Sequence, residues 1–259
     1  MEQSDGLYPR LLTASDELEG LRVLLEAILA IGRPNGAYLE IVGCFLSIDF
    51  RSDRWEDFCA FRDRYLEAGG EFAQTGWTRA TRVYTTRVDK PTKPSYRKRL
   101  VGFPDKPRSW NPGEEGLNQI EKISMELAKK PGFSNLSFVI LRPADLHDQF
   151  RPGYVPCAIA GDFKFRNGRL DLNVMFRTND ALGLGYADIY YMRRLQMEVL
   201  SGAKRLNPAL GTANIGLLNM YFCRTYVQRT RRNKAGLRLD GLKAANAVLS
   251  AIRPIRLPD

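Results

Sequence analysis

The 259-residue chain contains a single histidine, His147, which lies in the short polar stretch 146–149. Nucleophilic catalysis by a Ser-His or Cys-His pair needs a histidine, and the surroundings of this one are more typical of a surface loop. The four cysteines are spread along the chain without a CxxC pair. Because nitrogen and sulfur ligands are so few, we expect no zinc site and no metal cofactor.

Long hydrophobic runs are also missing. The longest, residues 21–31, is interrupted by Arg22 and Glu26 and is too short to span a bilayer. The first residues lack the charged-then-apolar pattern of a signal peptide. We therefore expect a cytoplasmic protein without a membrane partner.

Basic residues dominate the charge balance. Lysine and arginine number 39 against 29 acidic residues, which gives a net charge of +10 and indicates anionic partners. Phosphorylated metabolites and polyglutamylated cofactors satisfy this as well as nucleic acid does. The two densest basic runs, residues 90–99 and 229–238, are not interleaved with aromatic residues in the way of a single-strand stacking surface. Both are more typical of a solvated face, so nucleic acid is not the expected partner.

Hydrophobic periodicity predicts helices and strands in mixed order. Helices are expected at 18–32, 55–68, 117–127, 182–200 and 239–252, and strands at 38–50, 136–141, 157–166, 169–177 and 215–227. Thr13-Ala-Ser-Asp16 indicates a cap for the first helix, Gly43 a bulge or bend in the first strand, and Gly69-Gly70 the end of the second helix. Asn167-Gly168 predicts a tight hairpin between the third and fourth strands. No composition change marks a boundary, so we expect one α+β domain over residues 1–259, with residues 85–113 as a basic, proline-rich loop or insertion.

The most informative stretch begins at Val155-Pro-Cys157 and continues through Arg177-Thr-Asn-Asp180 to Asp188. A catalytic cysteine must form a thiolate, and an arginine on the neighbouring strand is a cation that would lower its pKa. The alternative is that Cys157 is a small buried apolar residue, as isolated cysteines often are. The intact Cys157 and Arg177 arrangement favours a nucleophile.

These motifs, in order and spacing, resemble the thymidylate synthase superfamily, in which a catalytic cysteine follows a proline and an Arg-Ser-x-Asp motif comes later at the same interval. Segments 33–43, 143–146 and 219–221 resemble the family's phosphate-binding loop, the segment before the cysteine and its His-x-Tyr motif. The resemblance covers most of the chain from Leu21 to Tyr221. It implies a thymidylate synthase-like α+β fold, with a large, mixed, bent β-sheet and flanking helices, that dimerises through the sheet.

The resemblance also implies a reaction and a set of roles. The Cys157 thiolate would add to C6 of a pyrimidine nucleoside monophosphate, and 5,10-methylenetetrahydrofolate would be the co-substrate that supplies the carbon to C5. Asp63, with Glu56 as second choice, would organise water for catalysis. Substrate would be bound by Arg33, Thr178, Asp188, Asn219 and Tyr221, and folate by Asp180 and Tyr84.

Asp188 replaces the asparagine with which thymidylate synthases read uracil. Cytosine presents an N4 amino donor and an N3 acceptor, so a carboxyl group that accepts from N4 and shares a proton with N3 satisfies both positions. The family's cytidylate 5-hydroxymethylases carry an aspartate at this position, and they finish the reaction with water. Alternatively, Asp188 is simply an acidic residue at the start of a helix, where the helix dipole favours it.

Other positions depart from the family pattern. Ser134 and Asn135 stand where the family supplies two phosphate-binding arginines from the partner subunit, and Ala158 replaces a histidine. The leading hypothesis is a folate-dependent hydroxymethylase of CMP or dCMP, in nucleoside-antibiotic or modified-nucleotide metabolism. Two alternatives stay open: a methylase or hydroxymethylase of a uracil nucleotide, and a catalytically inactive basic protein that binds nucleotides or RNA on this fold.

Overall fold

The computed structural model describes residues 10–50, 54–85, 95–102, 116–142, 145 and 155–253. Its strands are β1 (Arg10–Ala14), β2 (Arg33–Asn35), β3 (Tyr38–Asp49), β4 (Leu136–Val139), β5 (Ala158–Arg166), β6 (Arg169–Phe176), β7 (Asn179–Asp180), β8 (Asn214–Gln228), β9 (Thr230–Arg232) and β10 (Arg238–Asp240). The helices are α1 (Glu17–Ile31), α2 (Trp55–Ala68), α3 (Gly70–Tyr84), α4 (Tyr96–Val101), α5 (Gln119–Lys129), α7 (Gly185–Leu206) and α8 (Gly241–Ile252), with a 3₁₀ turn at Pro208–Leu210. His147 and most of segment 143–146 lie outside the described residues.

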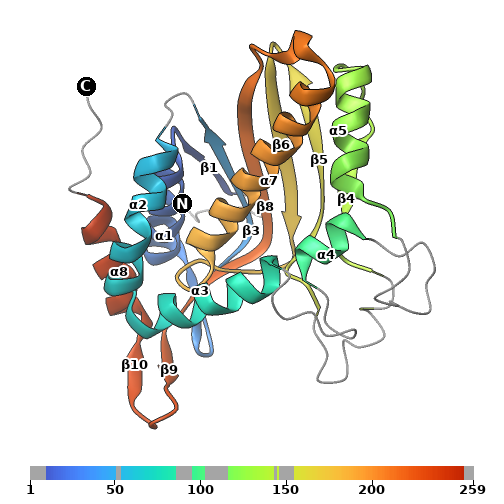
Figure 1. Ribbon diagram of the computed structural model, residues 1–259. Coiled ribbons are helices and arrows are strands. Elements are labelled where there is room, and N and C mark those ends of the chain that lie inside the picture. The colour runs from blue at the N-terminus through green and yellow to red at the C-terminus, as the bar shows by residue number, and fades with distance from the viewer. Residues whose placement is uncertain are drawn as a thin grey trace, which may run out of the picture.

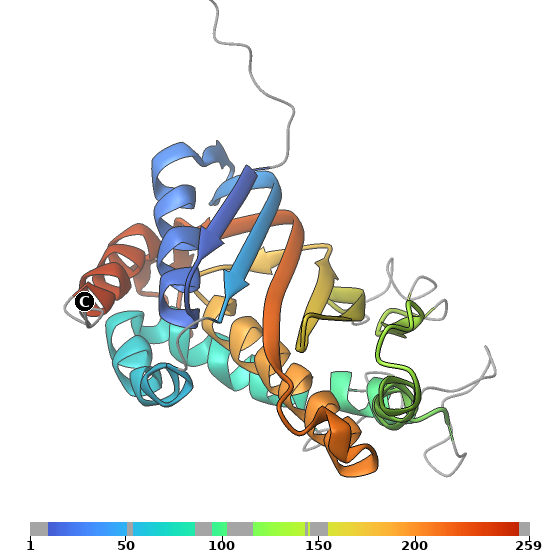
Figure 2. The same ribbon diagram turned by 90° about the horizontal axis from the view of Figure 1, so that it is seen from above.

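One large mixed sheet organises the molecule. Its strands follow the order β1-β3-β8-β6-β5-β4, with β2 paired to β3 and β7 paired to β8. The β3–β8, β5–β6 and β4–β5 pairs are antiparallel, whereas β1–β3, β6–β8 and β7–β8 are parallel. Helices α1, α7 and α8 pack against this sheet, and the described helices lie on one side of it (Figures 1 and 2). The expected α+β class with a mixed sheet and flanking helices is confirmed.

Local sequence explains the main helices. Asp16 caps α1 by accepting a hydrogen bond from the Glu19 backbone N–H at 2.8 Å, and the predicted apolar stripe from Leu18 to Ile28 is buried. Helix α7 crosses the middle of the sheet, and its buried Arg193 forms an ion pair with the buried Glu17 of α1 at 3.3 Å. None of the helices in the described ranges is long and apolar enough to cross a bilayer.

Helix α3 was not expected from the sequence. The Gly69-Gly70 pair predicted the end of α2, which is confirmed, but the chain starts a new helix at once. Gly70 has a φ of +54°, a left-handed conformation that lets the backbone change direction between the two helices. Further along α3, a Cβ on Gly76 would lie 1.8 Å from the Gly183 carbonyl oxygen. Glycine therefore allows α3 to pack directly against the backbone that precedes α7.

Strands β3 and β8 change their pleat together at one point. On β3, Cys44, Leu46 and Ile48 face the helices, but beyond Gly43, which has a φ of +68°, the buried residue is Ile41. The alternation on β8 changes opposite the same glycine, from buried Phe222 to buried Thr225. The sequence predicted a bulge or bend at Gly43, and the structure shows that it shifts which side chains of both strands face the helices.

The other face of the sheet carries exposed apolar side chains. Val42 is 71% exposed, Leu11 66% and Met175 41%, and they come from three different strands. Seen from above, the described helices all lie away from this face (Figure 2). Exposed apolar side chains on the open face of a sheet can contribute to a contact surface.

Candidate functional site

A cavity of about 600 Å³ lies where β6, β7 and the C-terminal end of β8 meet α3 and the start of α7. Such a volume suits a small-molecule ligand. Six of the residues predicted for the site line it: Tyr84, Cys157, Arg177, Thr178, Asp180 and Asp188. The structure therefore brings the stretch from Cys157 to Asp188 together in one place.

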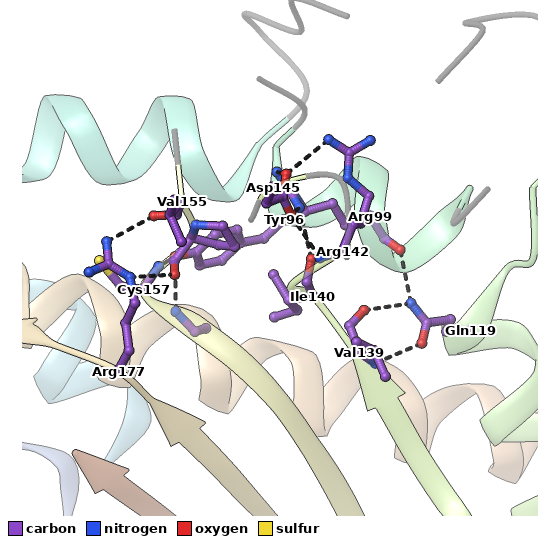
Figure 3. Close-up of polar contacts among 12 residues, drawn as sticks. Tyr96, Arg99, Gln119, Val139, Ile140, Arg142, Asp145, Val155, Cys157 and Arg177 are labelled. Carbon is purple, nitrogen blue, oxygen red and sulfur yellow. Dashed lines mark hydrogen bonds and ion pairs between the residues drawn. The ribbon is translucent and has the colours of Figure 1, made fainter. Parts of the chain in front are cut away.

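Backbone hydrogen bonds hold the predicted nucleophile at the start of β5. The Cys157 N–H donates to the Tyr96 hydroxyl oxygen at 2.8 Å, and the Ala158 N–H donates to the same atom at 3.2 Å. Arg177 donates through Nε to the Pro156 carbonyl and through a terminal nitrogen to the Val155 carbonyl, both at 3.0 Å (Figure 3). Arg177 thus fixes the segment that leads into Cys157.

Tyr96 is itself held in place by a buried ionic cluster behind α4. Arg99, on the same short helix, pairs with Asp145 at 2.6 Å, and both side chains are buried. Gln119 of α5 donates to the Arg99 and Val139 carbonyls, both at 2.9 Å, which ties α4 to the β4 edge of the sheet (Figure 3). Removing one partner of such a buried pair leaves an uncompensated charge and is strongly destabilising. The position of Cys157 therefore depends on Arg99, which lies in the loop or insertion predicted for residues 85–113.

The Cys157 thiol is a weak acid in this setting. Burial raises its pKa to about 11, and the nearby Asp188 carboxylate adds to the effect. Arg177 and Arg79 act in the opposite direction, because a neighbouring cation favours the thiolate. Arg177 therefore has the predicted effect on the thiol, but burial exceeds it, and the thiol is protonated at neutral pH.

Asp188 lies in the first turn of α7 and is almost completely buried. Its Oδ1 accepts a hydrogen bond from the Tyr84 hydroxyl at 2.5 Å, and its Oδ2 accepts one from the Asn179 amide at 2.7 Å. Burial raises the pKa of Asp188 to about 7, whereas the hydrogen bonds from Tyr84 and Asn179 lower it. Both protonation states of this carboxyl group are therefore populated near neutral pH.

Asp180 is a second carboxyl group of the cavity. Its Oδ1 accepts from the Gly183 backbone N–H at 3.0 Å, in the turn that leads to α7. Burial raises its pKa, and this is opposed by the Gly183 hydrogen bond and by the positive charges of Arg79 and Arg231. Asp180 therefore faces the cavity and also shapes this turn, and its contact with a folate stays a prediction.

Several residues of the cavity lining were missed by sequence reasoning, among them the polar residues Arg79 of α3 and Arg224 and Tyr226 of β8. The Arg224 guanidinium lies 4.9 Å from the ring centres of both Tyr38 and Tyr226, and it forms an ion pair with Glu40. The sequence contains a pattern that could have indicated Arg224 and Tyr226. A polar residue two positions before a tyrosine, as in Asn219-Met-Tyr221, recurs five residues later as Arg224-Thr-Tyr226.

Asn219 and Tyr221, predicted to contact the sugar, do not line the cavity. They lie in the middle of β8, and Asn219 exchanges side-chain hydrogen bonds with Ser47 and Asn173 of the neighbouring strands. At about 3.3 Å per residue, the strand must run roughly 17 Å further from Tyr221 before Tyr226 reaches the cavity. The structure therefore does not bring these two predicted residues together with the stretch from Cys157 to Asp188.

Arg33 and Asp63 are also absent from the cavity lining. Arg33 lies in the exposed strand β2, opposite Glu40 of β3. The Asp63 side chain is 78% exposed on α2 and pairs with its neighbour Arg62 at 3.0 Å. Glu56, the second choice for the water-organising carboxylate, is likewise exposed. A helical pattern alone cannot show which surface a polar residue faces, and these residues face solvent.

A second cavity, of about 800 Å³, lies beside the first, and Tyr84 and Tyr96 line both. Its other walls come mainly from α2, α4 and α7, and they include Trp55, Tyr190 and Cys59. Burial raises the pKa of Cys59, as do the charges of Glu56 and Glu17. Since only Tyr84 among the predicted site residues reaches this cavity, the first cavity is the candidate active site. Among the described residues, no cluster of His, Cys, Asp and Glu is arranged to hold a metal ion.

No family model matches the chain. A putative thymidylate synthase from Methanosarcina acetivorans is 31% identical over 106 residues, which is 40% of this chain and 45% of that protein. The matched part thus spans about half the length of that relative. This likeness supports a thymidylate synthase-like relationship, and the mixed sheet with flanking helices is compatible with that fold. The relative's name specifies neither a cytosine base nor hydroxymethylation.

Replacing Arg79 by glutamine should raise the pKa of the Cys157 thiol, because one of the two cations that favour the thiolate is lost. We expect alkylation of Cys157 by iodoacetamide at pH 8.5 to slow by about threefold, the equivalent of roughly half a pKa unit. Arg82→Gln, on an exposed part of the same helix and outside the cavity lining, is the matched control. Equal rates in the two variants would contradict the role of Arg79.

Proposed function

We propose that the protein is a one-carbon transferase that hydroxymethylates C5 of a cytosine nucleotide, CMP or dCMP. One observation supports this most strongly: the candidate nucleophile Cys157 and a carboxyl group with a pKa near 7, Asp188, line the same cavity. The likeness to a putative thymidylate synthase supports the reaction class. The choice of base rests on Asp188.

Asp188 provides both functions that a cytosine base needs. In its neutral form it donates a proton to N3, and in its ionised form it accepts from the N4 amino group. Because burial raises its pKa to about 7, passing this proton to and from the base costs little at neutral pH. A uracil base offers an N3–H donor and an O4 acceptor instead, so the neutral form could satisfy it, but the ionised form, which cannot donate, would face O4 without a hydrogen bond.

Cys157 adds to C6 of the bound base, and the electron pair of the C5–C6 double bond moves toward C5. Protonation of N3 by Asp188 withdraws electron density from the ring and favours this attack. Because burial raises the thiol pKa, formation of the thiolate needs a bound ligand that changes the charge balance, for instance through the positive charge of a base protonated at N3. Arg177, which holds the backbone before Cys157, keeps the sulfur in position during the addition.

The cavity also has a surface that fits a folate. Asp180 and Tyr226 line it, and Ala80, Val83 and Leu184 contribute apolar side chains to the lining. A buried carboxylate that accepts hydrogen bonds suits the ring N–H and amino donors of a pterin, so Asp180 would hold this group. When bound, 5,10-methylenetetrahydrofolate supplies the one-carbon unit, and water completes the hydroxymethyl group.

Cations of this chain can replace the missing arginine pair. Arg177, Arg79 and Arg224 all line the cavity, and the Thr178 hydroxyl lies beside Arg177 in the sequence. Arginine binds phosphate through charge-assisted hydrogen bonds from a rigid planar group. We infer that the nucleotide phosphate and the folate carboxylates are bound by these arginines.

Two other functions have observations in their favour. A uracil nucleotide as substrate agrees with the putative thymidylate synthase relative. A catalytically inactive protein that binds nucleotide or RNA agrees with the raised pKa of Cys157 and with the basic β9–β10 hairpin. The following experiment distinguishes these functions from the proposed one.

Incubation of the protein with methylenetetrahydrofolate and each pyrimidine nucleotide in tritiated water should exchange the C5 hydrogen of CMP or dCMP. The product should gain the mass of one CH2O group. Cys157→Ala should abolish both signals, whereas Cys59→Ala, in the neighbouring cavity, should keep them. Exchange that persists in Cys157→Ala excludes the mechanism, and the absence of exchange with all nucleotides favours the inactive binding protein.

Asp188→Asn should change the preferred base. An asparagine donates to O4 and accepts from N3–H of uracil, so turnover should shift from the cytosine toward the uracil nucleotide. Because a buried site discriminates strongly against mismatched polar groups, we expect the ratio of kcat/KM values to change by at least about tenfold. An unchanged ratio would show that another residue reads the base.

We also propose that two copies associate through the open face of the sheet, as the family resemblance implies. Met175 lies on β6 in the interior of the sheet, and Val42 of β3 and Leu11 of β1 are further exposed apolar residues of the sheet. Burying such side chains between two copies would contribute about 25 cal/mol per Å².

Met175→Glu should convert a dimer into a monomer, because it would bury a charge at the interface. Light scattering during size-exclusion chromatography measures the mass directly. Leu237→Glu changes an equally apolar, exposed residue in the β9–β10 hairpin and should leave the dimer intact. A monomeric wild-type protein would contradict the proposed association.

A further inference from the structure

Three buried hydrogen bonds link β8, β7, α7 and α3 through side chains alone. The Thr225 hydroxyl donates to Asn179 Oδ1 at 2.9 Å, and the Asn179 amide donates to Asp188 Oδ2 at 2.7 Å. The Tyr84 hydroxyl donates to the other oxygen of Asp188 at 2.5 Å. Thr225 and Asn179 are buried, and neither lines the cavity.

The orientation of the Asn179 amide is set from both of its sides. Asn179 lies opposite Thr225 in the parallel β7–β8 pair, and Thr225 points inward because β8 changes its pleat after Phe222. An ionised Asp188 can only accept hydrogen bonds, so the NH2 group of Asn179 faces it, and the Thr225 hydroxyl donates to the amide oxygen on the other side. Without that hydroxyl, the amide oxygen loses its donor and the side chain is no longer held against Asp188.

We propose that Asn179, oriented by Thr225, is a positioning residue that fixes the plane and the protonation of Asp188. The proposal rests on the function proposed above, in which Asp188 reads the base. With one oxygen held by Asn179 and the other by Tyr84, the carboxyl plane cannot turn, and its remaining lone pairs are directed consistently at a bound ligand. Base recognition thus depends on two residues that do not touch the base.

The charges around Asp188 show why these donors matter. Tyr84 of α3 and Tyr65 of α2 interact with it electrostatically, as does the Cys157 thiol at the start of β5, and Asp180 of β7 opposes its ionisation. In that set, the hydrogen bonds from Tyr84 and Asn179 are the influences that favour the carboxylate against burial. Losing the Asn179 donor should therefore move the titration of Asp188 to higher pH.

Cys157 reports this titration without any substrate. The charge of Asp188 raises the pKa of the Cys157 thiol. A plot of the rate of alkylation by iodoacetamide against pH should therefore change slope near pH 7, where Asp188 ionises, and this change of slope is called the bend below. Asp188→Asn should remove the bend, which assigns it. Thr225→Val keeps the shape of the side chain but removes the hydroxyl, and it should raise the bend by about one pH unit. Thr225→Ser keeps the hydroxyl and should leave the bend at its wild-type pH.

Asn179→Leu is a second variant, which removes the amide donor itself and should raise the bend at least as far as Thr225→Val. Circular dichroism identifies any variant that does not fold. If Thr225→Val or Asn179→Leu fails to fold, the pH of the bend in the folded one tests the proposal. A bend at the wild-type pH in a folded Thr225→Val or Asn179→Leu protein overturns the proposal. If the bend moves but no nucleotide is turned over, the positioning role stands and the proposed function fails. If a cytosine nucleotide is turned over but the bend does not move in these variants, the proposed function stands and the positioning role fails.

Discussion

The antiparallel pairing of β3 with β8 is the interaction on which the rest of the structure depends. It runs from Tyr38 opposite Gln228 to Asp49 opposite Leu217, near the centre of the sheet. On its inner side the two strands form the apolar surface on which α1 and α8 pack. Between Tyr38 and Gly43 on β3, the same pairing places Arg224 and Tyr226 of β8 in the cavity and turns Thr225 toward Asn179. The bend at Gly43 thus links the packing of the core to the arrangement of residues in the cavity.

The candidate site is assembled from groups that other residues hold rather than from a single motif. Cys157 is positioned by the Tyr96 hydroxyl and by Arg177, and Tyr96 in turn sits on a helix anchored by the buried Arg99–Asp145 pair. Asp188 is held in the same indirect way through its two hydrogen-bond donors. This arrangement keeps the reactive groups rigid in an environment whose low polarity shifts their pKa values.

Much of the fold could be predicted from the sequence, because periodicity and turn chemistry are local properties. The Asp16 cap, the Asn167-Gly168 hairpin and the bend at Gly43 all occur where the residues indicated them. The cluster from Cys157 to Asp188 was found because its members are close in sequence. The cavity residues Arg79 and Arg224 were missed for the opposite reason: α3 was not recognised, and the register of β8 against β3 is a tertiary property. For the same reason Asn219 was assigned to a site that its strand reaches only several residues later.

The β3–β8 pairing also has a consequence for how the chain must be made. Strand β3 is synthesised before its partner β8, and the segment between them makes up more than half of the 259 residues. At the usual pace of 5–20 residues per second, the edge of β3 would wait roughly ten seconds or longer on the ribosome before its partner exists. An unpaired strand edge invites contact with other chains. A cellular chaperone that protects newly made β3 would therefore have its greatest effect before β8, which carries Arg224 and Tyr226 of the cavity, has been synthesised.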